Sequence, residues 1–126
     1  MKTRYTIALS ILAGAALGVA ATQGLHAQAK PPAYIFTEFE ILDQTALKEF
    51  SSKVAAVVKG SGAKYLVRRG RIVGLEGKAP NLFTVQVFDS MEKAQEFRNS
   101  KAWQELTPLR EKALKQRSFI AEGIAQ

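Results

Sequence analysis

The chemistry open to this chain is limited by two residue types, histidine and cysteine. The sequence has no cysteine, and its one histidine, His26, lies near the N-terminus. If that segment is removed, serine and cysteine nucleophiles activated by histidine are excluded, as are metal sites built from imidazole or thiolate and a histidine-ligated haem. What remains is carboxylate, tyrosine, arginine and lysine chemistry, and we expect no metal and no cofactor.

Two carboxylates are the candidate catalytic groups. Glu38 and Glu40 share one face of an expected strand, about 7 Å apart. They could act as acid and base, or one could take a proton from carbon. The alternative is structural, because acids on a strand commonly pair with lysines and arginines, here those of a partner subunit.

A second group of residues could bind an anion with an apolar body. Phe97 and Trp103 could form the wall of a pocket between a helix and the sheet, although their helical spacing is more typical of core residues. Arg110 follows at helical spacing, and its guanidinium could lie beside the indole or in solvent. Tyr65 and Arg68 complete the expected ligand-binding set, but a regular strand would place these two on opposite faces.

The role of Arg68 stays open at this stage. Its guanidinium could hold a carboxylate or enolate oxygen through two parallel hydrogen bonds. It could equally form a structural salt bridge to Glu76 or Glu40.

The first 29 residues have the layout of a secretory signal peptide. Lys2 and Arg4 precede an uncharged run, Ile7 to Ala21, and a small-x-small pattern follows at 27–29. The run is shorter than the ~20 residues of a spanning helix, so a retained anchor is the weaker alternative. We expect cleavage after Ala29 and a mature domain of residues 30–126 that is periplasmic or secreted and free of the membrane.

The charge pattern gives no indication of nucleic-acid binding. The chain has 18 lysines and arginines against 11 acidic residues, and the two signs alternate along it. The one basic cluster is Arg68, Arg69 and Arg71, whereas a nucleic-acid footprint is a basic stripe or face. Without cysteine there is no disulfide, so the single domain must be stabilised by packing and gains from dimerisation.

Hydrophobic periodicity predicts the first half of the domain. Residues 33–41 alternate as a strand, and a helix capped by Asp43 ends at Gly60 and Gly62. Strands are expected over 65–69 and 72–76 around a turn at Gly70, and another strand over 82–88.

The second half is predicted to be mainly helical. Asp89 is the expected N-cap of a helix, with Glu92 completing a capping box. Asn99 and Ser100 should interrupt this helix, and Pro108 should begin a new segment or kink it. The final strand is expected over 118–124.

These elements predict an α+β protein with a ferredoxin-like βαββαβ fold, in which helices cover one face of an antiparallel sheet. The open face would carry Tyr34 and Phe36 beside Glu38 and Glu40. A face that mixes aromatic rings with carboxylates indicates a partner. Two such sheets facing each other would form a homodimer, a dimeric α+β barrel.

Three segments resemble the core signature of the DUF1330 family. They are Gly62 to Gly70, Leu75 to Gly77, and the later run from Phe88 to Arg110. The resemblance extends from Ala33 to about Gly123, with Ala63 where a second glycine is usual and Trp103 where tyrosine is commoner. It implies a dimeric α+β barrel and no particular activity, since related proteins include cofactor-free monooxygenases, lactone isomerases and haem enzymes.

Two functions are therefore compatible with the sequence. The first is a non-catalytic protein that binds a small organic anion. The alternative is a cofactor-free enzyme, isomerase-like or monooxygenase-like, acting on a small organic acid. It would use Glu38 or Glu40 as base, with Arg68 or Arg110 holding an oxyanion.

Overall fold

The computed structural model of the protein describes residues 30–125, and the expected signal peptide lies outside this range. Pro31–Ala125 form one compact unit. In this part of the chain no helix is long and apolar enough to span a membrane. The elements in chain order are β1 (Ala33–Ile41), α2 (Gln44–Ser61), β2 (Lys64–Arg68), β3 (Leu82–Phe88), α3 (Met91–Asn99), α4 (Lys101–Gln104), α5 (Thr107–Ala113) and β4 (Leu114–Glu122).

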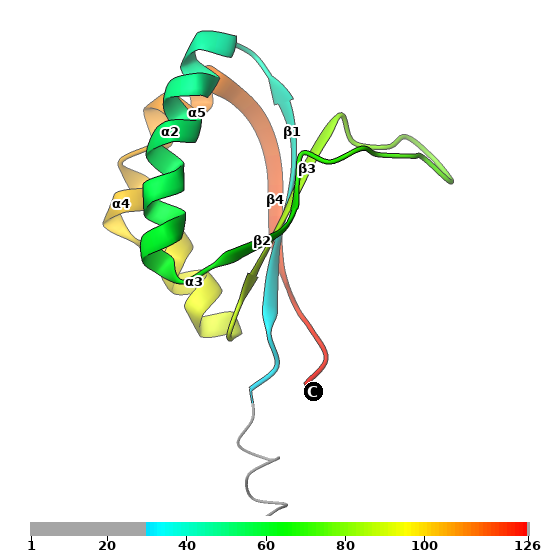
Figure 1. Cartoon of the computed structure of the whole chain (residues 1–126), viewed down its shortest axis with the longest axis vertical. Coiled ribbons are helices and arrows are strands. Elements are labelled where there is room, and N and C mark those ends of the chain that lie inside the picture. Colours follow the sequence, from blue (N-terminus) through cyan, green and yellow to red (C-terminus); the bar gives the residue numbers. More distant parts are fainter. Residues whose placement is uncertain (1–29, 126) are drawn as a thin grey trace, which may run out of the picture. The chain divides into compact units, whose positions relative to one another are not determined.

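The four strands form one antiparallel sheet in the order β2-β3-β1-β4. The helices all lie on one face of this sheet, and the other face is left open (Figure 1). This is the ferredoxin-like arrangement, and it confirms the fold class expected from the sequence.

Helix α2 forms where the sequence predicts it. The Asp43 carboxylate accepts a hydrogen bond from the Ala46 backbone N–H at 2.8 Å, which satisfies one of the free donors of the first turn. Gly62 ends the helix in the left-handed conformation (φ 77°), which glycine adopts without steric cost. The buried residues of α2 recur at helical spacing and face the sheet: Ala46, Leu47, Phe50, Val54 and Val58.

The second helical region differs from expectation at its start. Ser90 caps α3 in place of Asp89, and its hydroxyl accepts from the Lys93 backbone N–H at 3.2 Å. The backbone of Ser90 is extended, as is usual for an N-cap residue. Asp89 lies one residue earlier, directly after the end of β3. The interruption at Ser100, which caps α4, and the start of α5 beside Pro108 confirm the predicted breaks.

Two strand predictions are wrong. Residues 71–81 contain no strand or helix and project from the sheet as an extended arm (Figure 1). The apolar alternation around Val73 and Leu75 finds no neighbouring strand to pair with, and these side chains are 65% and 93% exposed. Strand β4 begins at Leu114, four residues earlier than expected, because it pairs with β1 along its full length from Leu114↔Ile41 to Glu122↔Ala33.

The two faces of the sheet have different side chains. The inner face of β1 contributes Ala33, Ile35 and Phe39 to the core beneath the helices. On the outer face, the Phe36 ring lies 5.2 Å from Phe119 and 6.2 Å from the rings of Phe83 and Tyr34. We call these four residues the outer aromatic patch: Tyr34, Phe36, Phe83 and Phe119.

Candidate functional site

A β-bulge in β2 brings two expected site residues to the same face. The pairing of β2 with β3 shifts between Tyr65 and Val67, so Tyr65 pairs with Gln86 and Arg68 with Thr84. In a regular strand the two side chains would point to opposite faces, but the extra residue reverses the alternation. The expectation of opposite faces is therefore wrong. The Arg68 guanidinium lies 4.9 Å from the Tyr65 ring centre.

A row of polar residues crosses the inner face of the sheet. The strand registers align Arg68 with Thr84, Thr84 with Thr37, and Thr37 with Ser118, so the row spans all four strands. The hydroxyls of Thr37 and Ser118 lie 3.0 Å apart. The helix-facing side of the sheet is therefore polar along this row, although Thr37 itself is buried.

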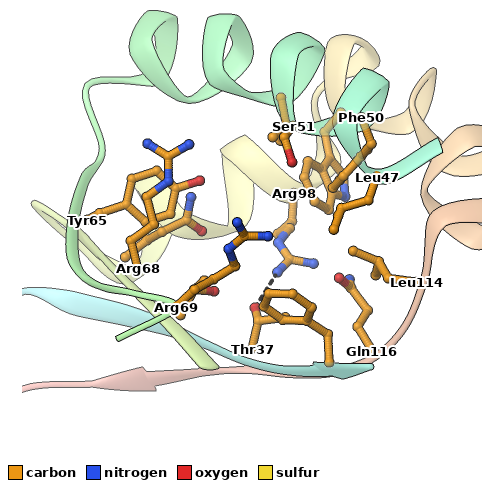
Figure 2. A pocket seen from close by; sticks show the side chains of 15 residues that line it. Thr37, Leu47, Phe50, Ser51, Tyr65, Arg68, Arg69, Arg98, Leu114 and Gln116 are labelled. Atoms are coloured by element: carbon orange, nitrogen blue, oxygen red, sulfur yellow. Dashed lines mark hydrogen bonds between the residues drawn. The ribbon is translucent and has the colours of Figure 1, made fainter. Parts of the chain in front are cut away.

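A cavity of about 150 Å³ lies between this row and the helices. Its apolar wall comes from α2, Trp103 and the ends of β1 and β4. Its polar groups come from all four strands, from Arg69 after β2, from Ser51 of α2 and from Arg98 of α3 (Figure 2). All fifteen lining residues belong to the described part of the chain, and three of them are arginines while none is acidic: Arg68, Arg69 and Arg98.

Arg98 is the most enclosed charge of this cavity. Its Nη2 donates to the Ser118 hydroxyl at 2.6 Å and reaches the Thr37 hydroxyl at 3.4 Å, and its guanidinium lies 4.5 Å from the Trp103 ring centre. Its Nε is buried and has no hydrogen-bond partner within residues 30–125. Burial, and then the positive charge of Arg110, lower the pKa of Arg98 to about 10, so it remains charged at neutral pH.

Arg110 belongs to the same charged cluster but lies outside the cavity lining. Its guanidinium is 5.8 Å from the Trp103 ring centre, and its Nε is also buried without a partner in the described range. Two arginines therefore contact one indole, and no carboxylate forms an ion pair with either among the described residues. Of the two placements left open by the sequence, beside the indole or in solvent, the structure has Arg110 beside the indole.

Arg69 has an unusual backbone conformation at the end of β2. Its φ is 53°, in the left-handed region that residues other than glycine seldom occupy, and its N–H donates to the Phe83 carbonyl at 3.0 Å. Figure 2 shows its side chain reaching into the cavity toward Arg98. Such local strain is found most often at functional sites.

The sequence interpretation missed Arg69 and Arg98. Arg98 follows the core residue Phe97 on α3 and looks like an ordinary solvated position. The signal that could have revealed it lies elsewhere, in Thr37 and Ser118, which are polar residues on the inner face of two central strands.

The other candidate residues are distributed as follows. Tyr65 and Trp103 line the cavity, while Phe97 packs in the core against Phe88 (5.4 Å) and Trp103 (5.3 Å). Glu38 and Glu40 lie on the opposite, outer face, where Glu38 pairs with Arg117 of the same chain at 3.1 Å. The sheet thus separates both glutamates from the cavity. Within residues 30–125, Arg68 forms no ion pair with Glu76 or Glu40.

Sheet order, helices on one face and a cavity between the two layers define a small ferredoxin-like α+β protein. Residues 32–124 match the model of the family described as "Domain of unknown function (DUF1330)". The chain therefore belongs to the DUF1330 family. No curated protein matches it.

Solved structures of low sequence identity share the fold. The RPA0582 protein of unknown function from Rhodopseudomonas palustris is 11% identical, with 85% of this chain and 94% of that chain covered and a TM-score of 0.58. The methylated RPA0582 protein is also 11% identical, with 83% of this chain and 90% of that chain covered and a TM-score of 0.62. A conserved protein from Methanosarcina mazei Go1 is 14% identical, with 77% and 97% covered and a TM-score of 0.51. These similarities concern the fold alone.

Proposed function

We propose that the protein binds a small organic anion in the cavity between the sheet and the helices. The observation that carries this proposal is the Arg98 guanidinium, which is largely buried, faces no carboxylate in the cavity lining and keeps a buried Nε without a partner. A buried polar group left unpaired costs about 1–3 kcal/mol, and more when it is charged. A bound carboxylate would remove this cost and supply the missing negative charge.

The composition of the cavity supports an acid that also has an apolar part. Leu47, Phe50 and Trp103 form one wall, and the polar row of the sheet forms the other. Ligand sites of this kind are largely apolar and use a few polar groups to fix the orientation of the ligand. Inorganic anions would leave the apolar wall without contacts.

The enzyme alternative has less support from the geometry. A carboxylate base must come within hydrogen-bond reach of the proton it removes. Glu38 and Glu40 lie on the other side of the sheet, and the fifteen residues around the cavity include no acid. Of the two functions, binding without catalysis therefore fits the arrangement of Tyr65, Arg68 and Arg98 better.

A panel of organic acids and their primary amides tests this proposal. In calorimetry at low salt, we expect carboxylates with short apolar chains to bind saturably and the amides of the same chains to give no signal. Trp103 is the only tryptophan of the chain and lines the cavity, so its fluorescence gives an independent readout. Equal binding of acids and amides, or no binding of any acid, would contradict the proposal.

We also propose that the outer face of the sheet is the contact between two copies of the chain. The outer aromatic patch includes Phe119, which is 48% exposed. Next to the patch, Glu38 and Glu40 of β1 pair in register with Arg117 and Lys115 of β4. A two-fold interface brings the same face of both copies together, and this face has an apolar centre beside charges of both signs.

We further propose that the mature protein is exported, starting near Lys30, and acts in the periplasm or outside the cell. This rests on the basic start, the short apolar run and the small residues at 27 and 29. N-terminal sequencing of the protein from a secreting host should begin at Lys30 or within a few residues of it. Full-length chain retained in the membrane fraction would contradict export.

A further inference from the structure

We propose that the natural ligand is a short organic dianion, a dicarboxylate whose two charged ends are bound at opposite ends of the polar row. This inference rests on the proposed anion-binding function and adds the number and placement of the ligand's charges. It follows from where the arginines lie, from which groups between them lack partners, and from the size of the cavity.

The arginines are grouped at two places along the row. Arg98 lies at the β1–β4 end, where it donates to Ser118 and reaches Thr37. Arg68 lies at the β2 end, beyond β3, with its guanidinium over the Tyr65 ring, whereas Arg69 extends its side chain from this end toward Arg98 (Figure 2). β2 and β1 are two strand spacings apart, about 10 Å at the backbone, so a single carboxylate reaches both groups only if the side chains converge on it.

The cavity also contains a polar group between these two ends. Gln86 of β3 is buried and lines the cavity, and its side-chain amide makes no hydrogen bond within residues 30–125. Gln86 pairs with Ile35 and Tyr65, so this amide lies beside the row, one inward-facing position along β3 from Thr84. A ligand that extends along the row would pass it and could bond to it.

The charges of the cavity favour two negative groups over one. Arg68, Arg69 and Arg98 all line the cavity, and no acidic residue lines it. A monoanion at Arg98 leaves Arg68 without a negative partner in the cavity, whereas a dianion reaches both ends of the row.

The volume sets the size of this acid. Drug-sized ligands occupy pockets of about 300–1,000 Å³. The cavity here is about 150 Å³, which suits an acid with a short carbon chain. The apolar wall of Leu47, Phe50 and Trp103 would contact the methylene groups between the two carboxylates.

Chain-matched acids test the inference directly. Calorimetry would compare succinate, glutarate and adipate with butyrate, pentanoate and hexanoate, which have the same chain lengths and one carboxylate fewer. We expect the best dicarboxylate to bind at least ten-fold more tightly than its monocarboxylate counterpart.

Two variants locate the two ends. Arg98→Met should weaken both kinds of acid, whereas Arg68→Met should weaken the dicarboxylate about ten-fold and leave the monocarboxylate unchanged. Arg71→Met is the matched control, since Arg71 is exposed and outside the cavity lining. Circular dichroism confirms that each variant is folded.

The possible outcomes separate the two proposals. Equal affinity for chain-matched mono- and dicarboxylates in the unmodified protein would overturn the dianion inference and leave the anion-binding function standing. No binding of any of the six acids would overturn both. An unchanged dicarboxylate affinity in Arg68→Met would also overturn the two-ended placement.

Discussion

Replacing Arg98 by methionine is expected to weaken organic-acid binding by about 100-fold and to make the unliganded protein more stable. Two charge-assisted hydrogen bonds to a bound carboxylate would be lost, each contributing about 1.5–3 kcal/mol. A loss of about 3 kcal/mol corresponds to somewhat more than a hundred-fold in the dissociation constant. Methionine keeps much of the packing volume against Trp103 and removes the charge.

The gain in stability follows from the lowered pKa of Arg98. Burial and the nearby Arg110 lower this pKa to about 10, so the folded state disfavours the charged form of the side chain. The difference between this pKa and the ordinary pKa of an arginine side chain corresponds to about 3 kcal/mol of free energy. Part of this gain is offset by lost packing, so we expect the free energy of unfolding at pH 7 to rise by about 1–3 kcal/mol in Arg98→Met. The hydroxyls of Thr37 and Ser118 still contact each other after the change.

The lowered pKa of Arg98 also determines how the stability difference between the unmodified protein and Arg98→Met depends on pH. Above pH 10 the folded state releases the Arg98 proton before the unfolded state does, so the unfolded state binds more protons and stability rises with pH. The destabilising effect of Arg98 is therefore complete at neutral pH and declines above pH 10. The stability difference between the unmodified protein and Arg98→Met should be constant from pH 7 to 9 and narrow at higher pH.

Denaturant unfolding followed by circular dichroism measures these quantities, with Arg71→Met as the control. That variant should bind acids and unfold like the unmodified protein. An Arg98→Met protein that binds acids normally would show that Arg98 is a structural residue. A variant that is less stable by more than 1 kcal/mol would contradict the argument from the buried charge.

Replacing Phe36 by glutamate is expected to convert the protein from a dimer to a monomer. Phe36 lies on the central strand β1 and contacts the three other rings of the outer aromatic patch. In a dimer formed through this face its new carboxylate would be buried without a partner, which costs several kcal/mol. We therefore expect the dimer dissociation constant to rise by at least a hundred-fold.

Light scattering at micromolar concentration should give about twice the chain mass for the unmodified protein and a single chain mass for Phe36→Glu. Leu42→Glu is the matched control, because Leu42 is 60% exposed and lies beyond the end of β1, outside the outer aromatic patch. This control should remain dimeric. A monomeric unmodified protein, or a dimeric Phe36→Glu that is folded, would contradict the proposed interface.

Most of the fold could be predicted from the sequence because its signals are local. The cap at Asp43 and the glycine at Gly62 define α2 through short-range backbone chemistry, and the alternation of β1 reports directly which side is buried. The irregular arm was misread because alternation does not reveal whether a pairing strand exists. The start of β4 was misread because Leu114 fits a helical spacing but pairs with Ile41, which is distant in sequence.

The candidate site was harder to predict because it depends on register and on a bulge. Tyr65 and Arg68 come to one face only through the extra residue between them, and one sequence gives no sign of that residue. Arg98 becomes a cavity residue only because β1 and β4 present Thr37 and Ser118 beneath it. Helical spacing places Trp103 toward the sheet, where it is part of the core and also lines the cavity.

A crystal structure of the protein with adipate would show whether the acid binds between the sheet and the helices. We expect one carboxylate within hydrogen-bond distance of the Arg98 Nε, which has no partner in the described chain, and the carbon chain against Trp103. Adipate bound only on the outer face of the sheet or among exposed lysines, with none in the cavity at saturating concentration, would contradict it.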